Sequence, residues 1–182
     1  MLIEETSRAH DEAWLATIRA QLPPLPFVTV FGSSTATAEA VLVAPWQPIG
    51  GILARAGFGV LTGGYDGTMR LVSENARAAG GVSIGITASS LADRADPDAY
   101  SRIIAVPTVF HRLEALLRLS DACFFLPGGI GTAVELLVGL WLTDRQLMRS
   151  KPLVLLGAHW QPLLAEALSR LLIFASGGAR KG

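Results

Sequence analysis

The sequence predicts an α/β fold, a Rossmann-like three-layer αβα sandwich with a parallel sheet, formed as a single domain over residues 1–182. Short apolar segments alternate with helix-like segments, which is the pattern of a parallel sheet whose strands are joined by helices. The apolar segments lack a polar residue at every second position, so both faces of the sheet are expected to be covered. Glycine clusters follow three of these segments, as is typical of tight strand-to-helix turns.

The elements follow from these patterns in chain order. An amphipathic helix is predicted at about residues 7–22, where Pro23 and Pro24 end it, and the core is expected at about residues 27–174. Apolar runs predict strands at residues 27–31, 58–61, 82–87, 102–106, 122–126 and 153–156. The segments between them predict helices at residues 37–56, 68–79, 107–119, 132–148 and 160–174.

Three segments need separate comment. Pro45 and Pro48 must kink or interrupt the helix at residues 37–56. Pro107 is suited to the first turn of the helix at residues 107–119. The segment at residues 88–101 is polar and rich in aspartate, so it is expected to be an exposed loop. The chain contains no repeat or low-complexity linker that would indicate a second domain.

The composition limits the possible environments of the protein. Of the 182 residues, 51% are apolar and 16% are charged, yet no run reaches the roughly 18 apolar residues that a membrane span needs. The single cysteine, Cys123, excludes an intrachain disulfide and fits a reducing compartment. The N-terminus lacks the basic and apolar regions of a signal peptide. We therefore expect a cytoplasmic protein that does not enter a membrane.

The charge balance bears on partners. Fifteen basic residues balance fifteen acidic ones, and Lys and Arg are scattered apart from Arg180 and Lys181 near the C-terminus. Proteins that bind nucleic acid usually carry a basic excess or a basic stripe, so we expect no nucleic-acid partner. A small anionic ligand stays compatible with this composition.

The glycine clusters predict a binding site. In an open parallel sheet, ligands bind at the carboxyl ends of the strands, where helix N-termini offer free N–H groups to an anion. The strand-to-helix turns themselves also call for glycine, but three such loops at one sheet edge favour a shared ligand crevice. None matches the usual dinucleotide or P-loop fingerprint. The residues expected there are Gly32, Ser33, Ser34, Gly63, Gly64, Gly67, Gly128, Gly129, Gly131 and Thr132.

Two charged residues are candidates for chemistry. Thr132 and Glu135 form a Thr-x-x-Glu pattern, which can be a helix capping box. The same carboxylate, placed behind a glycine loop at the ligand edge, could instead hold ribose hydroxyls or stabilise positive charge on a sugar. Arg112 near the start of its helix opposes the helix dipole, so it is either a surface residue or a residue that faces a bound anion.

At these residues the sequence resembles a known family. The stretch PGGIGTAVE, residues 127–135, matches the PGGxGTxxE motif of the LONELY GUY (LOG) family of cytokinin-activating phosphoribohydrolases, once described as lysine decarboxylases. The resemblance covers roughly residues 27–168. It includes VTVFGSS (28–34), GFGVLTGGYDGTM (57–69), HRLEALLRLSDACFFLPGG (111–129) and WLTDRQLMRSKPLVLL (141–156).

The resemblance implies hydrolysis of the N-glycosidic bond of a nucleoside 5′-monophosphate to free base and ribose 5-phosphate. It implies phosphate contacts at Gly129, Gly131 and Thr132, and it makes Arg112 and Glu135 the catalytic pair. A carboxylate can stabilise the oxocarbenium-like transition state of such a cleavage. Arg112 stays protonated, so it would act as an electrostatic clamp. No cofactor is implied.

The sequence departs from the family pattern at several positions. The lysine that usually follows the arginine is Leu113. In the family's GGG-x-x-G-x-M loop, the middle glycine of the GGG is taken to be Tyr65, and Arg70 replaces the glycine that often follows the methionine. These changes leave the preferred base open. They also keep an alternative open, in which the protein is a non-catalytic carrier of a nucleotide or of molybdenum cofactor on the same scaffold.

The remaining candidates are weaker. His10, His111 and His159 lack metal-ligand spacing, so we expect no metal site, and His111 is either a surface residue or part of the pocket. Cys123 lies in an apolar run and is expected to be a core residue. The helix that includes residues 135–148 is apolar nearly all round. Such a helix must be covered on more than one side, so we expect a homodimer.

Overall fold

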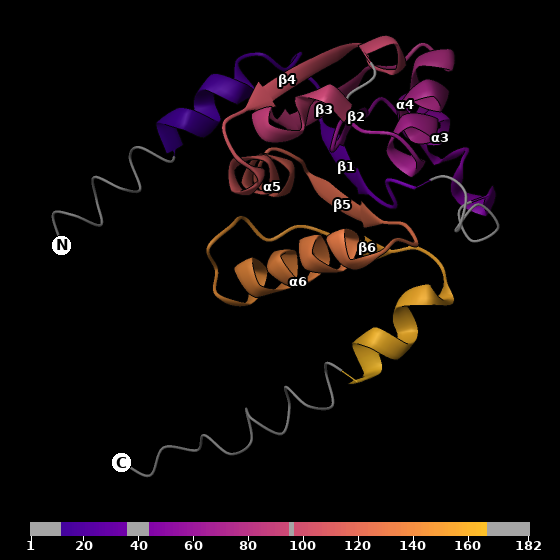
Figure 1. The fold of residues 1–182 in the computed structure, drawn as a ribbon, viewed down its shortest axis with the longest axis vertical. Coiled ribbons are helices and arrows are strands. Elements are labelled where there is room, and N and C mark those ends of the chain that lie inside the picture. Colours follow the sequence, from indigo (N-terminus) through magenta and orange to yellow (C-terminus); the bar gives the residue numbers. More distant parts are fainter. Residues whose placement is uncertain (1–11, 36–43, 95–96, 167–182) are drawn as a thin grey trace, which may run out of the picture.

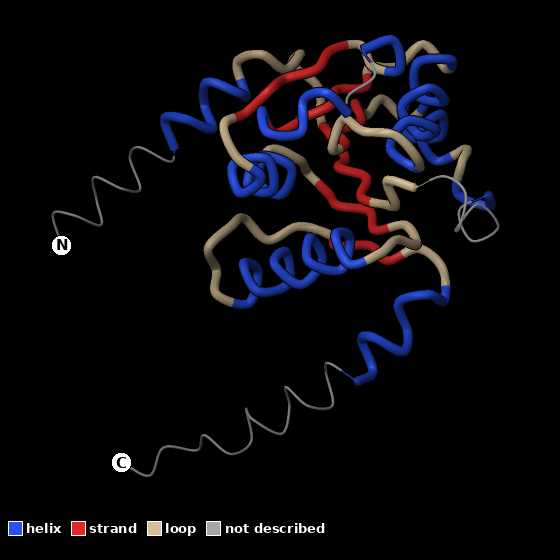
Figure 2. The backbone as a smooth tube through the Cα atoms, viewed as in Figure 1, coloured by secondary structure: helices blue, strands red, loops and turns tan. Residues whose placement is uncertain are grey.

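The computed structural model describes residues 12–35, 44–94 and 97–166 (Figures 1 and 2). Six strands form one sheet in the order β4-β3-β2-β1-β5-β6, and all neighbouring strands are parallel. The strands are β1 (Phe27–Phe31), β2 (Gly59–Thr62), β3 (Ser83–Ala88), β4 (Arg102–Val106), β5 (Ala122–Phe125) and β6 (Leu153–Leu155). This arrangement confirms the predicted Rossmann-like α/β fold with a parallel sheet.

Helices follow the strands as expected. The complete α-helices are α3 (Ile49–Arg55), α4 (Thr68–Ala78), α5 (Val109–Arg118) and α6 (Ile130–Asp144). The 3-10 helices are η1 (Ala44–Trp46), η2 (Ser89–Arg94), η3 (Pro97–Ala99) and η4 (Ala158–Trp160). Residues 12–19 and 161–166 are also helical. None of the helices in the described ranges is long and apolar enough to cross a bilayer.

The two faces of the sheet bury different side chains. Phe27 and Phe31 of β1 belong to a large apolar cluster with residues of α5 and α6. Val28 and Val30 point the other way, into a smaller cluster with residues of α3 and α4. Figure 1 shows α3 and α4 packed side by side and apart from α5 and α6. The burial of both faces explains why the central strands β1, β2 and β3 are mostly apolar and buried at every position.

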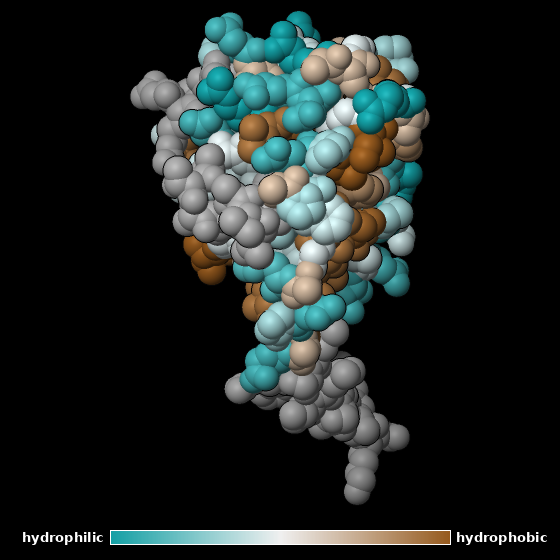
Figure 3. Space-filling view, turned by 90° about the vertical axis from the view of Figure 1, so that its right-hand side faces the viewer, coloured by the Kyte–Doolittle hydropathy of each residue, from teal (hydrophilic) through white to brown (hydrophobic). Residues whose placement is uncertain are grey.

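The surface is mixed in character. On the face shown in Figure 3, exposed apolar groups lie between hydrophilic ones. Among the described residues, α6 exposes several large apolar side chains, including Val134, Leu137 and Trp141. The described part of the chain therefore leaves one side of this helix exposed.

The structure refines several sequence predictions. Pro48 is the residue that precedes α3, so the helix expected at residues 37–56 is interrupted where proline required it; its part at residues 37–43 lies outside the described residues. The prediction of an exposed loop at residues 88–101 is wrong, because this segment contains the end of β3 and the two 3-10 helices η2 and η3. Ala99 and Tyr100 are buried, and the Tyr100 hydroxyl donates a hydrogen bond to the carbonyl of Tyr65. The Tyr100 ring packs on the sheet, since a Cβ on Gly85 of β3 would lie 3.3 Å from it.

The terminal helices are only partly described. Of the predicted helix at residues 7–22, the structure describes the part from residue 12, which is helical to residue 19. Of the predicted helix at residues 160–174, it describes the part up to residue 166. The rest of both predictions, and Arg180 with Lys181, lies outside the described residues.

Candidate active site

The three glycine loops meet at the carboxyl edge of the sheet because they pack directly on one another. A Cβ atom on Gly67 would lie 2.5 Å from the carbonyl oxygen of Ser33, and one on Gly128 would lie 3.1 Å from the Ser33 amide nitrogen. The Thr68 amide also donates to the Ser33 carbonyl, at 2.9 Å. The loops after β1, β2 and β5 thus touch where the chain changes its direction across the sheet, which is the usual ligand position in this architecture.

A pocket of about 300 Å³ lies between these loops. It is lined by Gly32, Ser33, Ser34, Thr35, Tyr65, Met69, Arg112, Gly129, Ile130, Gly131, Thr132 and Glu135. Most of the predicted site residues are therefore brought together. The other four predicted glycines, Gly63, Gly64, Gly67 and Gly128, do not line this pocket. Thr35, Met69 and Ile130 line the pocket although the sequence did not single them out.

The first turn of α6 differs from the sequence prediction. The helix begins at Ile130 with Gly129 as its N-cap, two residues before the expected start at Thr132, and it ends at Asp144. Thr132 is therefore inside the helix, where its side chain cannot cap the first turn, and no side-chain cap is formed. The capping-box interpretation of Thr132 and Glu135 is wrong, because a capping box needs the threonine at the N-cap.

Open space surrounds the two glycines at this helix start. A Cβ atom on Gly129 or on Gly131 would meet no other atom within 4 Å, so packing does not require glycine at either position. Thr132 is buried, and its hydroxyl has no hydrogen-bond partner among the described residues. Free N–H groups and the positive end of the helix dipole complete a surface that suits an anion.

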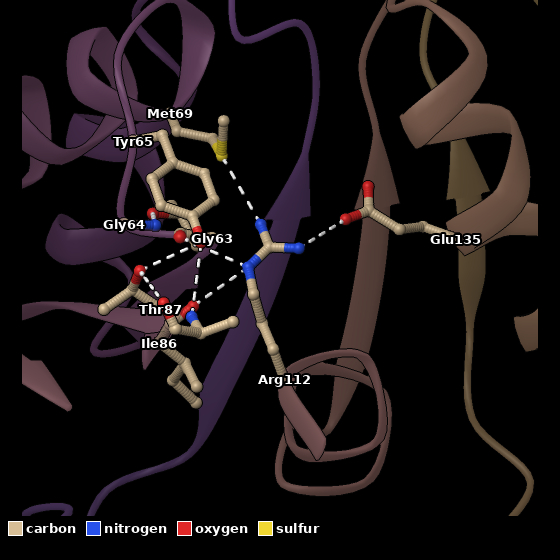
Figure 4. A network of polar contacts seen from close by, with 10 residues as sticks. Gly63, Gly64, Tyr65, Met69, Ile86, Thr87, Arg112 and Glu135 are labelled. Carbon is tan, nitrogen blue, oxygen red and sulfur yellow. Dashed lines mark hydrogen bonds and ion pairs between the residues drawn. The ribbon is translucent and has the colours of Figure 1, made fainter. Parts of the chain in front are cut away.

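Arg112 and Glu135 form an ion pair at the side of the pocket (Figure 4). Arg112 Nη1 lies 3.2 Å from Glu135 Oε1, and only 12% and 13% of the two side chains are exposed. Arg112 Nε donates to the carbonyls of Gly63, at 3.3 Å, and of Ile86, at 3.1 Å. Arg112 is therefore not a surface residue, because the ends of β2 and β3 and the α6 carboxylate hold it from several sides.

The absence of a side chain at Gly63 leaves the space that the Arg112 guanidinium occupies. A Cβ atom on Gly63 would lie 1.5 Å from Arg112 Nη2, so any side chain there would expel the guanidinium. The Arg112 helix, α5, begins at Val109, and the Thr108 hydroxyl caps it by accepting the His111 amide. The predicted start at Pro107 is thus two residues early.

Burial and the ion pair act on Glu135 in opposite directions. Desolvation raises the pKa of the carboxyl, while Arg112 lowers it through its charge and hydrogen bond; burial dominates, and the pKa of Glu135 rises to about 7. A carboxyl of this kind changes its protonation state close to neutral pH. Such a group can hold a proton or act as an anion with little energetic cost, which is typical of catalytic carboxyls.

The structure also shows what surrounds the weaker candidates from the sequence, His111, His159 and Cys123. His111 packs edge-on against Trp14 and lies outside the group of residues that line the pocket. The ring of His159 is in hydrogen-bond contact with the Gly128 carbonyl, at 3.1 Å, and so touches the loop from behind. Cys123 is buried in β5, where burial raises the pKa of its thiol. This thiol is a core group, as the sequence predicted.

The alignment of the glycine loop after β2 with the LOG pattern needs one correction. With Gly67 and Met69 as fixed points, the three glycines of the LOG pattern fall on Thr62, Gly63 and Gly64. Thr62, rather than Tyr65, is therefore the position that departs from the glycine run. Thr62 is buried, and its hydroxyl accepts a hydrogen bond from the Gly64 amide.

The fold and this site together define a Rossmann-like α/β protein in which a glycine-rich helix start faces a buried arginine–glutamate pair. The chain belongs to the SLOG cluster4 family, whose sequence model matches residues 25–170. The match confirms the resemblance that the motifs predicted.

Named relatives agree with this assignment. The cytokinin riboside 5′-monophosphate phosphoribohydrolase of Mycobacterium marinum is 36% identical over 107 residues, which cover 58% of this chain and 56% of the relative. The Arabidopsis thaliana protein LOG5, of the same named activity, is 40% identical over 79 residues, or 43% of this chain and 35% of the relative. The chain thus spans about half or less of the length of these curated relatives.

Solved structures add a second kind of relative. The molybdenum cofactor carrier protein of Chlamydomonas reinhardtii superimposes with a TM-score of 0.62 at 27% identity, and the match covers 81% of this chain and 84% of the carrier. The chain is therefore similar to named hydrolases in sequence and to a named cofactor carrier in structure.

Proposed function

We propose that this protein is a phosphoribohydrolase, which cleaves the N-glycosidic bond of a nucleoside 5′-monophosphate to give free base and ribose 5-phosphate. The observation that carries the proposal is the buried pair of Arg112 and Glu135, 3.2 Å apart, beside an open glycine-rich helix start. The names of the curated relatives support the same chemistry.

The phosphate is assigned to the start of α6. Gly129 and Gly131 leave room for phosphate oxygens, and the buried Thr132 hydroxyl is available as a further donor. The free N–H groups of the first helical turn would bind the dianion directly. The loop of Gly32, Ser33 and Ser34 forms the neighbouring wall, where the ribose would lie.

Glu135 is assigned to the reacting sugar. As the bond between C1′ and the base nitrogen breaks, positive charge develops on the ribose, and an ionised carboxyl stabilises it. One water molecule then supplies hydroxyl to C1′ and a proton to the departing base, which balances the reaction. Glu135 can orient this water, while the permanently charged Arg112 stabilises the departing base electrostatically.

The second copy of the chain is assigned to the exposed side of α6. Phe110 and Ile130 are 78% and 83% exposed, and Val134, Leu137 and Trp141 continue the apolar surface along the helix. Exposed apolar surfaces of this extent mark sites of protein association. We therefore propose a homodimer that buries this side of α6.

A second candidate function is a non-catalytic carrier of a nucleotide or of molybdenum cofactor. The structural similarity to the Chlamydomonas carrier, over 81% of this chain, favours it. A carrier has no evident need for the buried Arg112–Glu135 pair, and for this reason we prefer the hydrolase.

The test is a panel of nucleoside 5′-monophosphates incubated with the protein, with base release followed by chromatography. The wild type should release at least one base. Glu135→Gln keeps the size of the side chain but cannot become an anion, so we expect release to fall by about a hundredfold or more.

A matched control is Glu114→Gln, because Glu114 pairs with Arg118 on the outer part of α5, away from the pocket. This variant should release base like the wild type. If no substrate releases base while calorimetry still detects nucleotide binding, the hydrolase proposal fails and the carrier replaces it.

A further inference from the structure

Tyr65 lies against Arg112, yet the proposed chemistry does not use it. The Arg112 guanidinium carbon is 4.9 Å from the centre of the Tyr65 ring, and Figure 4 shows the ring beside the guanidinium, on the side away from Glu135. The electron-rich face of an aromatic ring attracts a cation at this distance. Tyr65 also lines the pocket.

The ring is fixed from several directions. The Tyr65 hydroxyl receives hydrogen bonds from the Thr87 hydroxyl, at 2.9 Å, and from the Ala88 amide, at 3.2 Å, both at the end of β3. The Tyr65 carbonyl accepts from the Tyr100 hydroxyl at 2.7 Å. Because the side chain is also buried, it has little freedom to leave this position.

The backbone before Tyr65 explains how the ring reaches Arg112. Gly64 has a φ of +78°, a conformation that glycine adopts without strain and that turns the chain back toward the pocket. Gly64 also packs closely on Gly85 of β3, since a Cβ on Gly85 would lie 2.8 Å from the Gly64 Cα. The loop therefore packs closely on β3 at Gly64, and the next side chain, that of Tyr65, lies against Arg112.

The hydrogen bonds of Arg112 do not fully fix the orientation of its guanidinium. Nε is held by two carbonyls and Nη1 by Glu135, whereas within the described ranges the hydrogen-bond partner of Nη2 is the Met69 sulfur, a weak contact at 4.0 Å. A guanidinium held at Nε and Nη1 can still rotate about the line that joins these two atoms. The guanidinium carbon lies over the face of the Tyr65 ring, and this contact opposes the rotation.

We infer that Tyr65 is a positioning residue, which holds the Arg112 guanidinium in the orientation that pairs with Glu135. The inference rests on the proposed function for its catalytic consequence, but not for the geometry itself. Removal of the ring should loosen the ion pair while leaving the glycine-rich start of α6 intact.

The titration of Glu135 can measure whether its ion pair with Arg112 has loosened, because few charged groups among the described residues surround the carboxyl. Arg112 of α5 is the cation that faces the carboxyl, and the Cys123 thiol of β5 is the other titratable group that interacts with it. Burial raises the pKa of Cys123, so the thiol stays neutral near pH 7. A change in the Glu135 titration will therefore report on Arg112.

The experiment follows the Glu135 carboxyl carbon by NMR in the ligand-free protein, with Glu135→Gln used to assign the signal. The wild-type midpoint is expected at about pH 7. In Tyr65→Ala the arginine is less well aligned, so the midpoint should rise by about 1 unit. Tyr65→Phe keeps the ring and loses the hydroxyl, and should move the midpoint less than Tyr65→Ala does.

The matched control is Asp66→Ala, which changes an exposed residue of the same loop that does not line the pocket. It should leave the midpoint where it is. An unchanged midpoint in Tyr65→Ala would overturn the inference, provided that circular dichroism shows a folded protein. Should that variant not fold, Tyr65→Leu keeps the bulk without the π face and must also raise the midpoint.

Activity gives a separate answer. If the protein releases base, Tyr65→Ala should lower kcat by about tenfold with little change in KM, since the phosphate site is elsewhere. A rise in KM alone would contradict a positioning role. Because the NMR midpoint is measured without substrate, absence of base release would count against the proposed function and leave the Tyr65 result standing.

Discussion

Glu135 lies where two electrostatic effects oppose each other. Its carboxyl is buried beside α5, which penalises the anion, and it is paired with Arg112, which favours it. The net result is a pKa raised from an ordinary 4.5 to about 7. A buried ion pair of this kind is weak support for stability, because desolvation offsets the attraction. Its presence at the pocket is better explained by chemistry than by folding.

This balance predicts how stability depends on pH. Between pH 4.5 and about 7 the folded protein keeps a proton on Glu135 that the unfolded chain has lost. The contribution of this group to stability is therefore present below pH 4.5 and declines as the pH rises through about 7. The decline is about 3 kcal/mol at most, from the difference in pKa. Urea unfolding at pH 5 and pH 8 measures it.

The control for this prediction is Glu135→Gln, which cannot titrate at this position. The difference in unfolding free energy between the variant and the wild type should shift in favour of the variant as the pH rises from 5 to 8. A difference that stays constant, or that shifts in favour of the wild type, would show that the folded-state pKa of Glu135 is not raised.

At the scale of an element, the start of α6 combines two kinds of glycine. Gly128 is required by packing, because its Cβ would lie 2.3 Å from the Thr132 hydroxyl oxygen. Gly129 and Gly131 border open space, so the fold does not explain them. This short segment therefore contains one glycine that packing requires, Gly128, and two that leave room for a ligand, Gly129 and Gly131.

This separation predicts opposite effects of two similar substitutions. Gly131→Ala should stabilise α6 by about 0.5 kcal/mol, since alanine favours a helix, yet weaken binding of a nucleoside 5′-monophosphate by about tenfold. Thermal unfolding and calorimetry measure the two effects. Gly128→Ala is the comparison, and it should lower the free energy of unfolding by about 1–3 kcal/mol through overpacking. If Gly131→Ala binds as tightly as the wild type, the phosphate does not lie at this glycine.

At the scale of the whole molecule, the topology decides where the site lies. The chain adds β2, β3 and β4 on one side of β1 and then returns to place β5 and β6 on the other. The loops after β1 and β5 are therefore far apart along the chain, yet they lie next to each other and border the same crevice. The uncovered side of α6 lies next to this crevice, because Ile130 at its start lines the pocket.

The proposed dimer is tested at this scale. Light scattering at micromolar concentration should give about twice the chain mass of 19.2 kDa. Trp141→Glu introduces a charge on the exposed side of α6, where the tryptophan is 54% exposed, and should give a monomer. Ile52→Glu on α3 is the control, since Ile52 is 50% exposed on the opposite face of the sheet and its variant should remain dimeric. A wild type with monomer mass would refute the dimer.

The sequence by itself determined the sheet and the position of the three glycine loops. Runs with apolar residues on both faces, such as residues 27–31, predict strands that are buried from both sides, and glycine marks the turns that follow them. These signals are local, because each depends on hydrophobicity or backbone freedom within a few residues. The motif around residues 127–135 also pointed to the family.

Only the tertiary structure decided what the charged residues do. The sequence could not distinguish a capping box from a site carboxyl at Glu135, nor a surface arginine from a buried one at Arg112. These two residues are 23 positions apart, and their ion pair depends on how α5 and α6 pack against the sheet. The sequence also did not predict the contact between the Tyr65 ring and Arg112. Side-chain direction and burial, which set both contacts, come from packing across the fold rather than from neighbouring residues.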